Sequence, residues 1–146
     1  MIIEVANEQE TRQLGERLGG LLKGGEIIEL AGDVGAGKTT FVKGLARGLD
    51  IEEDVQSPSF TINRMYEARD GLRLAHYDFY RLNDAGIMAD ELAETSEDSK
   101  TVTVIEWAGI VEGVLPEGHL TIGFVSPTDE SRKLTLTGAS ELLEKL

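Results

Sequence analysis

The chain has 146 residues, 40% of them hydrophobic, and its 14 Lys and Arg against 27 Asp and Glu give a formal net charge of −13. This charge argues against sequence-independent binding to nucleic acid or anionic lipid, because lysine and arginine drive such binding by releasing counterions from phosphates. The absence of cysteine excludes disulfides and thiol nucleophiles, and neither a membrane-spanning run nor a signal peptide is visible, so we expect a soluble, cytoplasmic protein with no membrane contact.

The N-terminal segment predicts a strand followed by a helix. Residues 2–5 form a short apolar run, and Asn7 with Glu10 three residues later has the pattern of a capping box. Leucines then recur with the helical period up to a Gly-Gly pair. Gly15 and Gly19 interrupt this helix, and each costs about 1 kcal/mol relative to alanine. We therefore expect the helix to pack closely on a neighbour at these two glycines.

The next segments predict a strand, a glycine loop and a helix, followed by a hairpin. Residues 26–31 read as a buried strand, and apolar residues repeat on one helical face after the loop at 32–38. Runs rich in β-formers at 60–68 and 72–78 flank Asp70-Gly71, which is a strong hairpin turn. These two strands are expected to be antiparallel.

The second half predicts further strands around an acidic segment. Residues 83–100 are acidic and weakly periodic, which fits either a solvated surface helix and loop or a contact face for a basic partner. The β-branched run at 101–105 reads as a central strand. Two late strands are expected at 119–125 and 133–137, and residues 141–146 fit either a short helix or a frayed tail.

These elements predict one α/β domain over residues 1–146. Strands and helices interleave at the start and a hairpin interrupts the middle. We therefore expect a single three-layer, P-loop NTPase-like domain with a mixed, mostly parallel central sheet and an antiparallel hairpin.

The loop at 32–39, Gly-Asp-Val-Gly-Ala-Gly-Lys-Thr, matches the P-loop pattern G-x-x-x-x-G-K-[ST]. Its glycines let backbone N–H groups turn inward around a phosphate, and the following helix adds the positive end of its dipole. Lys38 should reach the β- and γ-phosphates, and the Thr39 hydroxyl should bind Mg²⁺. The loop therefore predicts binding of a nucleoside triphosphate.

Other residues narrow the choice of nucleotide and reaction. The N/T-K-x-D motif that reads guanine is missing from the sequence, so ATP is favoured over GTP. Small-molecule kinases with a P-loop close an arginine-rich lid over the phosphate, but Arg132 is the only arginine after Arg81. A kinase is therefore disfavoured.

Two carboxylates stand at the carboxyl ends of predicted strands, where open α/β sheets bind ligands. Glu106 follows the apolar run 102–105, in the place of a Walker B acid, and Asp78 ends the second strand of the hairpin. One carboxylate should hold Mg²⁺ and the other should orient or deprotonate the attacking water. His76, two residues before Asp78, either tunes that carboxylate or is a packed structural histidine.

Four segments together resemble one known family. GDVGAGKTTF (32–41), SPSFT (57–61), HYDFYRL (76–82) and IEWAG (105–109) occur in the order and spacing of the bacterial TsaE family, also called YjeE, the ATPase of tRNA threonylcarbamoyladenosine (t⁶A) biosynthesis. The resemblance covers nearly the whole chain. The sequence has QSPSF where TSPTF is more usual in the family.

The resemblance implies roles for individual residues. Asp78 looks like the family's catalytic-loop aspartate, Glu106 with Thr39 would hold Mg²⁺, and Trp107 is the tryptophan beside the metal acid. Residues 57–61 look like a switch loop near the γ-phosphate. Catalytic roles would thus fall to Asp78, Lys38 and Glu106, and nucleotide contacts to Thr11, Val34, Gly35, Ala36, Gly37, Lys38, Thr39, Thr40 and Arg132.

The resemblance also implies partners and a role. The chain would bind ATP and Mg²⁺ and hydrolyse ATP slowly, acting with TsaB and TsaD to drive or reset their complex between turnovers, while tRNA is met only indirectly. The sequence shows no obvious arginine finger, Arg81 being no more than a candidate, so weak ATPase activity alone and stimulation by the partners are expected. The alternatives are a small-molecule or protein kinase and a nucleotide-sensing module with negligible hydrolysis.

Overall fold

Seven strands and four α-helices make up the part of the chain that the structure describes. The computed structural model describes residues 1–32, 37–56, 63–79, 86–109 and 115–146. In chain order the elements are β1 (Ile2–Val5), α1 (Glu8–Leu21), β2 (Ile27–Ala31), α2 (Lys38–Gly48), β3 (Asn63–Glu67), the 3-10 turn η1 (Arg69–Gly71), β4 (Arg73–Asp78), α3 (Ile87–Glu97), β5 (Thr101–Glu106), β6 (Leu120–Val125), β7 (Arg132–Thr137) and α4 (Ser140–Lys145).

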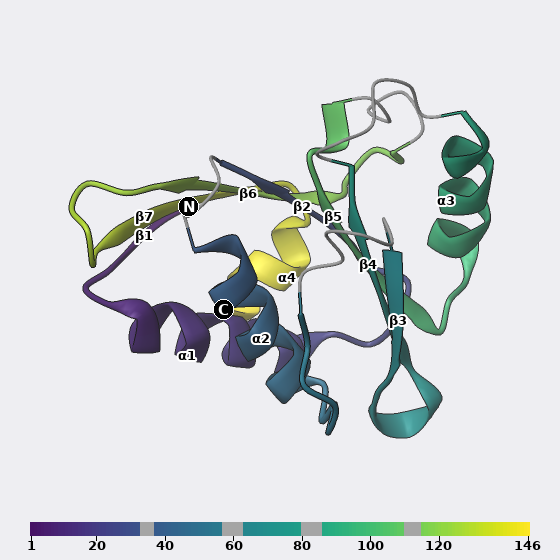
Figure 1. Cartoon of the computed structure of the whole chain (residues 1–146), viewed down its shortest axis with the longest axis horizontal. Coiled ribbons are helices and arrows are strands. Elements are labelled where there is room, and N and C mark those ends of the chain that lie inside the picture. Colours follow the sequence, from purple (N-terminus) through teal and green to yellow (C-terminus); the bar gives the residue numbers. More distant parts are fainter. Residues whose placement is uncertain (33–36, 57–62, 80–85, 110–114) are drawn as a thin grey trace.

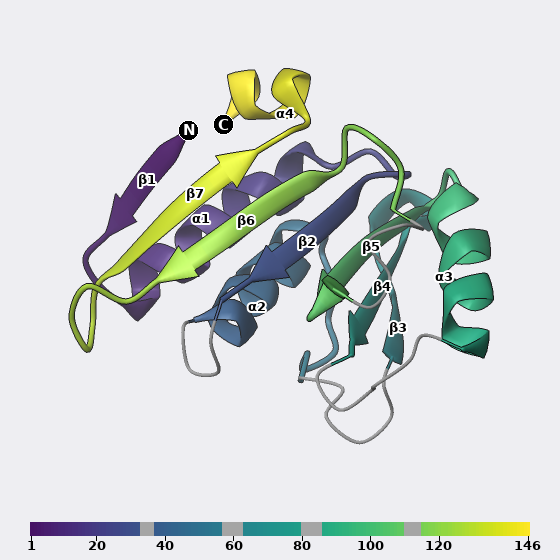
Figure 2. The same ribbon diagram turned by 90° about the horizontal axis from the view of Figure 1, so that it is seen from above.

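The strands form one mixed sheet in the order β1-β7-β6-β2-β5-β4-β3. The four central strands, β6, β2, β5 and β4, are mutually parallel, and the outer pairs β3–β4, β6–β7 and β1–β7 are antiparallel (Figure 2). The predicted hairpin is confirmed, with Asp70 (φ 56°) and Gly71 (φ 75°) in its turn. Its first strand is described from residue 63, so 60–62 of the prediction lie outside the described residues.

Helices lie against both faces of the sheet. Figure 1 shows α1 and α2 beneath it, and α3 beside β4 and β5 on the other side. The larger core joins α1 and α2 to the strands through residues such as Leu18, Phe41 and Val104. A smaller core brings Leu92 of α3 against Tyr77 of β4. The sheet thus has its P-loop helix on one face and its acidic helix on the other.

The start of α1 is as the sequence predicts. Asn7 is the N-cap, and its side chain accepts a hydrogen bond of 2.9 Å from the Glu10 amide. A Cβ at Gly15 would collide with the carbonyl oxygen of Phe41, and one at Gly19 with that of Leu45. The predicted close packing is therefore confirmed, and its partner is α2, the helix that follows the P-loop.

The acidic helix α3 contacts the hairpin through hydrogen bonds as well as through the packing of Leu92. The side chain of Asn63 in β3 donates a 2.7 Å hydrogen bond to Glu91, and the hydroxyls of Tyr77 and Thr95 lie 3.0 Å apart. Burial raises the pKa of Tyr77, so its hydroxyl stays protonated at neutral pH. Glu91 and Glu94 are both exposed, and Glu91 takes part in the fold through its hydrogen bond with Asn63.

Arg69, in the hairpin turn, joins the carboxyl ends of α1 and α2. Its guanidinium donates to the carbonyl oxygens of Gly48 at 2.6 Å, Leu22 at 2.7 Å and Gly19 at 3.2 Å. The last carbonyls of a helix have no partner within the helix, and a cation there also complements the helix dipole. One side chain thus satisfies two helix ends at once.

Replacing Arg69 by methionine should lower the free energy of unfolding by about 2–3 kcal/mol, because several carbonyls lose a charged donor. Urea unfolding measures this. The control is Arg73→Met on the other side of the same turn, where a half-exposed ion pair with Asp98 is screened by solvent and should contribute much less. Equal losses in the two variants would contradict the interpretation of Arg69.

Candidate functional site

Lys38, the first residue of α2, lies almost fully buried at the end of β2. Its side chain is 5% exposed, and its Nζ donates a 2.7 Å hydrogen bond to the carbonyl oxygen of Gly32. The same Nζ is 3.9 Å from Oε1 of Glu106 and 4.3 Å from the centre of the Trp107 ring. The lysine of the P-loop pattern therefore meets the end of β5 directly.

Glu106 is the last residue of β5 and is 3% exposed. Parallel pairing sets it level with Leu30 of β2 and with Asp78 of β4. The next residue, Trp107, has a left-handed backbone (φ 59°), which turns the chain sharply as its ring comes to cover Lys38. The two residues predicted at strand ends thus lie at one edge of the sheet, and the carboxylate of Glu106 faces the lysine.

His76 is the site residue whose partner the sequence did not reveal. It is fully buried, and its Nε2 lies 2.7 Å from Oε2 of Glu106. Its packed position agrees with one of the two sequence interpretations. Alternation along β4 showed that His76 shares a face with Asp78, but only the pairing with β5 reveals that the histidine reaches Glu106.

The predicted phosphate-binding residues lie partly within the described chain. Gly37 (φ 100°) caps α2, Thr39 is exposed on its first turn, and the Thr40 hydroxyl donates a 3.2 Å hydrogen bond to Glu8 of α1. Val34, Gly35 and Ala36 lie outside the described residues. So do the segment 57–61, proposed as a switch loop, and Arg81.

Thr11 and Arg132 lie in different surroundings. Thr11 is 1% exposed, and its hydroxyl donates a 3.4 Å hydrogen bond to the Asn7 carbonyl within α1. A Cβ built at Gly37 would lie 3.4 Å from Nε of Arg132, so this arginine adjoins the start of α2. Its Nη1 donates to the carbonyl oxygens of Thr128, Asp129 and Ser131. Arg132 is thus beside the P-loop, and Thr11 is within the helix that packs on α2.

The donor set suits Mg²⁺ bound together with a nucleotide. Among the described residues no three His, Cys, Asp or Glu side chains cluster into a metal site of their own. Mg²⁺ is usually held by one or two carboxylates plus waters and substrate phosphates, not by an all-protein cage. Glu106 supplies a carboxylate and Thr39 a hydroxyl at this edge. The residues present therefore fit such an ion.

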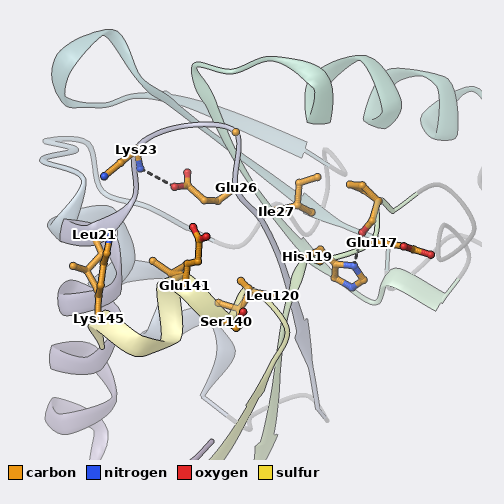
Figure 3. A pocket seen from close by; sticks show the side chains of 15 residues that line it. Leu21, Lys23, Glu26, Ile27, Glu117, His119, Leu120, Ser140, Glu141 and Lys145 are labelled. Carbon is orange, nitrogen blue, oxygen red and sulfur yellow. Dashed lines mark hydrogen bonds between the residues drawn. The ribbon is translucent and has the colours of Figure 1, made fainter.

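A pocket lies at the opposite end of the central strands from Lys38. This pocket of about 550 Å³ is bordered by Lys23, Glu26, His119, Glu141 and other residues near the start of β2, β6 and α4 (Figure 3). Both acidic and basic side chains line it, and the His119 ring lies 3.0 Å from the Pro116 carbonyl oxygen and 3.1 Å from Oε1 of Glu29. The pocket is separate from the Lys38 site.

No helix in the described part of the chain is long and apolar enough to cross a bilayer.

Comparison with known proteins agrees with the resemblance seen in the motifs. The family model described as threonylcarbamoyl adenosine biosynthesis protein TsaE matches residues 5–134. The chain is 38% identical to the tRNA threonylcarbamoyladenosine biosynthesis protein TsaE of Bacillus subtilis, over 96% of this chain and 87% of that protein. It is 41% identical to the protein of that name from Treponema pallidum, over 88% of this chain and 93% of the relative.

A solved structure gives the same answer for the fold. The crystal structure of YdiB from Bacillus subtilis superimposes with a TM-score of 0.80 at 34% identity and covers 99% of this chain and 92% of that one. The predicted α/β fold of the P-loop NTPase type, with its mixed sheet, is thereby confirmed. Since the family model matches most of the chain and these relatives align over nearly their full lengths, the chain belongs to the TsaE family of threonylcarbamoyl adenosine biosynthesis proteins.

Proposed function

We propose that the chain is a Mg²⁺-dependent P-loop ATPase that acts in t⁶A modification of tRNA together with TsaB and TsaD proteins. The observation that carries the proposal is the buried contact of Lys38 with Glu106, at the point where β2 leads through the glycine loop into α2. A lysine and a carboxylate in this arrangement suit a triphosphate with its metal. The names of the relatives supply the pathway.

Nucleotide binding would begin with an exchange of partners at Lys38. Its ammonium group donates to the Gly32 carbonyl and faces Glu106. The oxygens of a triphosphate are stronger acceptors than a carbonyl, so Lys38 would turn to the β- and γ-phosphates. The backbone N–H groups at the start of α2 would add further donors and the positive end of the helix dipole.

Glu106 and Thr39 would hold the metal. Bound Mg²⁺ neutralises charge that develops on the phosphates during transfer. Glu106 reaches this position from the end of β5, and Thr39 from the first turn of α2. Trp107, packed over Lys38, limits the water around both charged groups and so strengthens their electrostatic interactions.

Asp78 would act on the attacking water. It ends β4 level with Glu106, is partly exposed, and lies on the face of the sheet that α2 covers. A carboxylate oxygen there can accept a hydrogen bond from a water molecule and align it with the γ-phosphate. Asp78 therefore has the water-orienting role, and Glu106 the metal-holding role.

Hydrolysis by the isolated chain should be slow. Arg132 lies beside Gly37, but its guanidinium already donates hydrogen bonds to three carbonyl oxygens of the β6–β7 turn. An arginine supplied by a partner can raise such a rate by about 10³-fold or more. We therefore propose that the TsaB and TsaD partners stimulate turnover and are themselves reset by it.

The charge of the chain fits a division of labour in this assembly. A net charge of −13 disfavours direct binding to the tRNA backbone, because lysine and arginine drive such binding. In the proposed assembly the partners hold the tRNA, and this chain meets it only indirectly. Its own anionic ligand is ATP, which is bound by a few cations at one edge of the sheet.

Replacing Lys38 by methionine should lower ATP turnover by about 100-fold, because a donor to the transferred phosphate is lost. Partner-stimulated phosphate release measures the rate, and calorimetry measures nucleotide affinity. The matched control is Lys43→Met, an exposed lysine on the same helix. Wild-type turnover in the Lys38 variant would show that the site is placed wrongly.

The variant Asp78→Asn should bind ATP with an affinity within about threefold of wild type but lose about 100-fold in hydrolysis, since an amide is a much weaker base. Binding and single-turnover hydrolysis are measured on the same preparation. If the affinity for ATP falls as much as the rate of hydrolysis, Asp78 binds the metal or stabilises the fold, and the water-orienting role is wrong.

Reconstitution of t⁶A on tRNA tests the function itself. With TsaB, TsaD and the activated threonylcarbamoyl donor, modification should continue through many turnovers only when this chain and ATP are both present. The Lys38→Met variant should fail to restore it. Multiple turnovers without the chain would disprove the proposed function, whatever its ATPase activity.

A further inference from the structure

The proposed mechanism makes no use of His76, although it is a fully buried polar side chain in contact with the site. Its Nε2 is 2.7 Å from Oε2 of Glu106, and its Nδ1 has no hydrogen-bond partner among the described residues. A buried polar atom without a partner costs free energy. The hydrogen bond of Nε2 with Glu106 must therefore offset the cost of burying Nδ1 without a partner.

The contact divides the two oxygens of the Glu106 carboxylate. Oε2 is taken by His76, and Oε1 points to Lys38 at 3.9 Å. A carboxylate can only accept, so Nε2–H of His76 is the donor of this hydrogen bond. The oxygen that His76 leaves available is the one directed at the P-loop lysine, where nucleotide and metal would bind.

Without this donor, the plane of the carboxylate would be poorly determined. The last torsion of a glutamate is broad and has no strong preferred value, so the strand fixes the backbone of Glu106 but not the orientation of its oxygens. The His76 ring is itself fixed, because it is fully buried and its backbone pairs with Val104 of β5. A rigid donor thus sets the direction of a flexible acceptor.

We propose that His76 is a positioning residue for the metal site: it holds Oε2 of Glu106 so that Oε1 faces the Mg²⁺ ion that arrives with the nucleotide. The inference rests on the proposed function, which makes Glu106 a metal ligand. Hydrogen bonds that orient metal-binding carboxylates typically matter by about 10–100-fold in metal affinity or activity. His76 would affect Mg²⁺ affinity without touching ATP.

The test measures Mg²⁺ affinity and not hydrolysis. Mg²⁺ is titrated into protein saturated with ADP, and the signal is the fluorescence of Trp107, the only tryptophan in the chain. In His76→Leu the Mg²⁺ concentration at half-saturation should rise about 10-fold or more. The affinity for ADP measured in EDTA should change by less than about twofold, because the polar contact of His76 is with Glu106, which binds the metal and not the phosphates in this proposal.

Conservative and control variants separate positioning from packing. A glutamine at this position can place its amide nitrogen near that of Nε2, so His76→Gln should stay within about threefold of wild type, whereas the shorter His76→Asn should behave like His76→Leu. The control is Thr103→Val on β5, another fully buried residue whose hydroxyl lacks a partner in the described structure. It should leave the Mg²⁺ midpoint unchanged.

Each outcome bears on one of the two proposals. If wild type and Thr103→Val bind ADP with Mg²⁺ dependence and the Leu and Asn variants keep the same midpoint, the positioning role is wrong and the proposed ATPase stands. If wild type binds ADP with no Mg²⁺ dependence, the proposed metal site fails, and the inference with it. Should His76→Leu not fold, the comparison of His76→Gln with His76→Asn decides, and equal midpoints overturn the role.

Discussion

The structure depends on a pair of opposite charges buried at the edge of its core. Lys38 and Glu106 are both at most 5% exposed, and an unpaired charge at such a site would cost several kcal/mol, roughly, in lost hydration. Each is therefore supported by a second partner: the Gly32 carbonyl for the lysine and His76 for the glutamate. The pair and these partners come from α2, β4, β5 and the residue that follows β2, so the pair can exist only when the central sheet and the P-loop helix have assembled.

The packing of α1 on α2 explains how the lysine is held at this depth. Glycines at positions 15 and 19 let the two backbones approach until any Cβ would collide with α2. Arg69 then donates hydrogen bonds to the carboxyl ends of both helices, at the end of α2 opposite Lys38. Because α2 is fixed at its far end and along one side, its first residue has a defined place opposite β5. Residues remote from the P-loop thereby help to fix the backbone position from which the Lys38 side chain extends.

Much of this could be predicted from the sequence because it depends on local patterns. Asn7 with Glu10, the glycines of α1, the hairpin turn at Asp70 and the apolar run before Glu106 each signal their role within a few residues. The link between His76 and Glu106 has no local signal. The alternation along each strand shows which side chains share a face of that strand. Only the register of β4 against β5 shows that His76 and Glu106 are neighbours. Arg69 is hidden for the same reason, since its acceptors lie 21 and 47 residues away.

The buried pair also implies a coupling between nucleotide and metal in the proposed function. When Lys38 turns to the phosphates, Glu106 loses its neighbouring cation while it remains buried, and this is unfavourable unless another positive charge replaces the ammonium. Mg²⁺ arriving with the nucleotide is such a charge. Each ligand then favours binding of the other, and by linkage the effect must be equal in both directions. By holding Oε2 through the exchange, His76 keeps the free oxygen directed at the place where the new charge is needed.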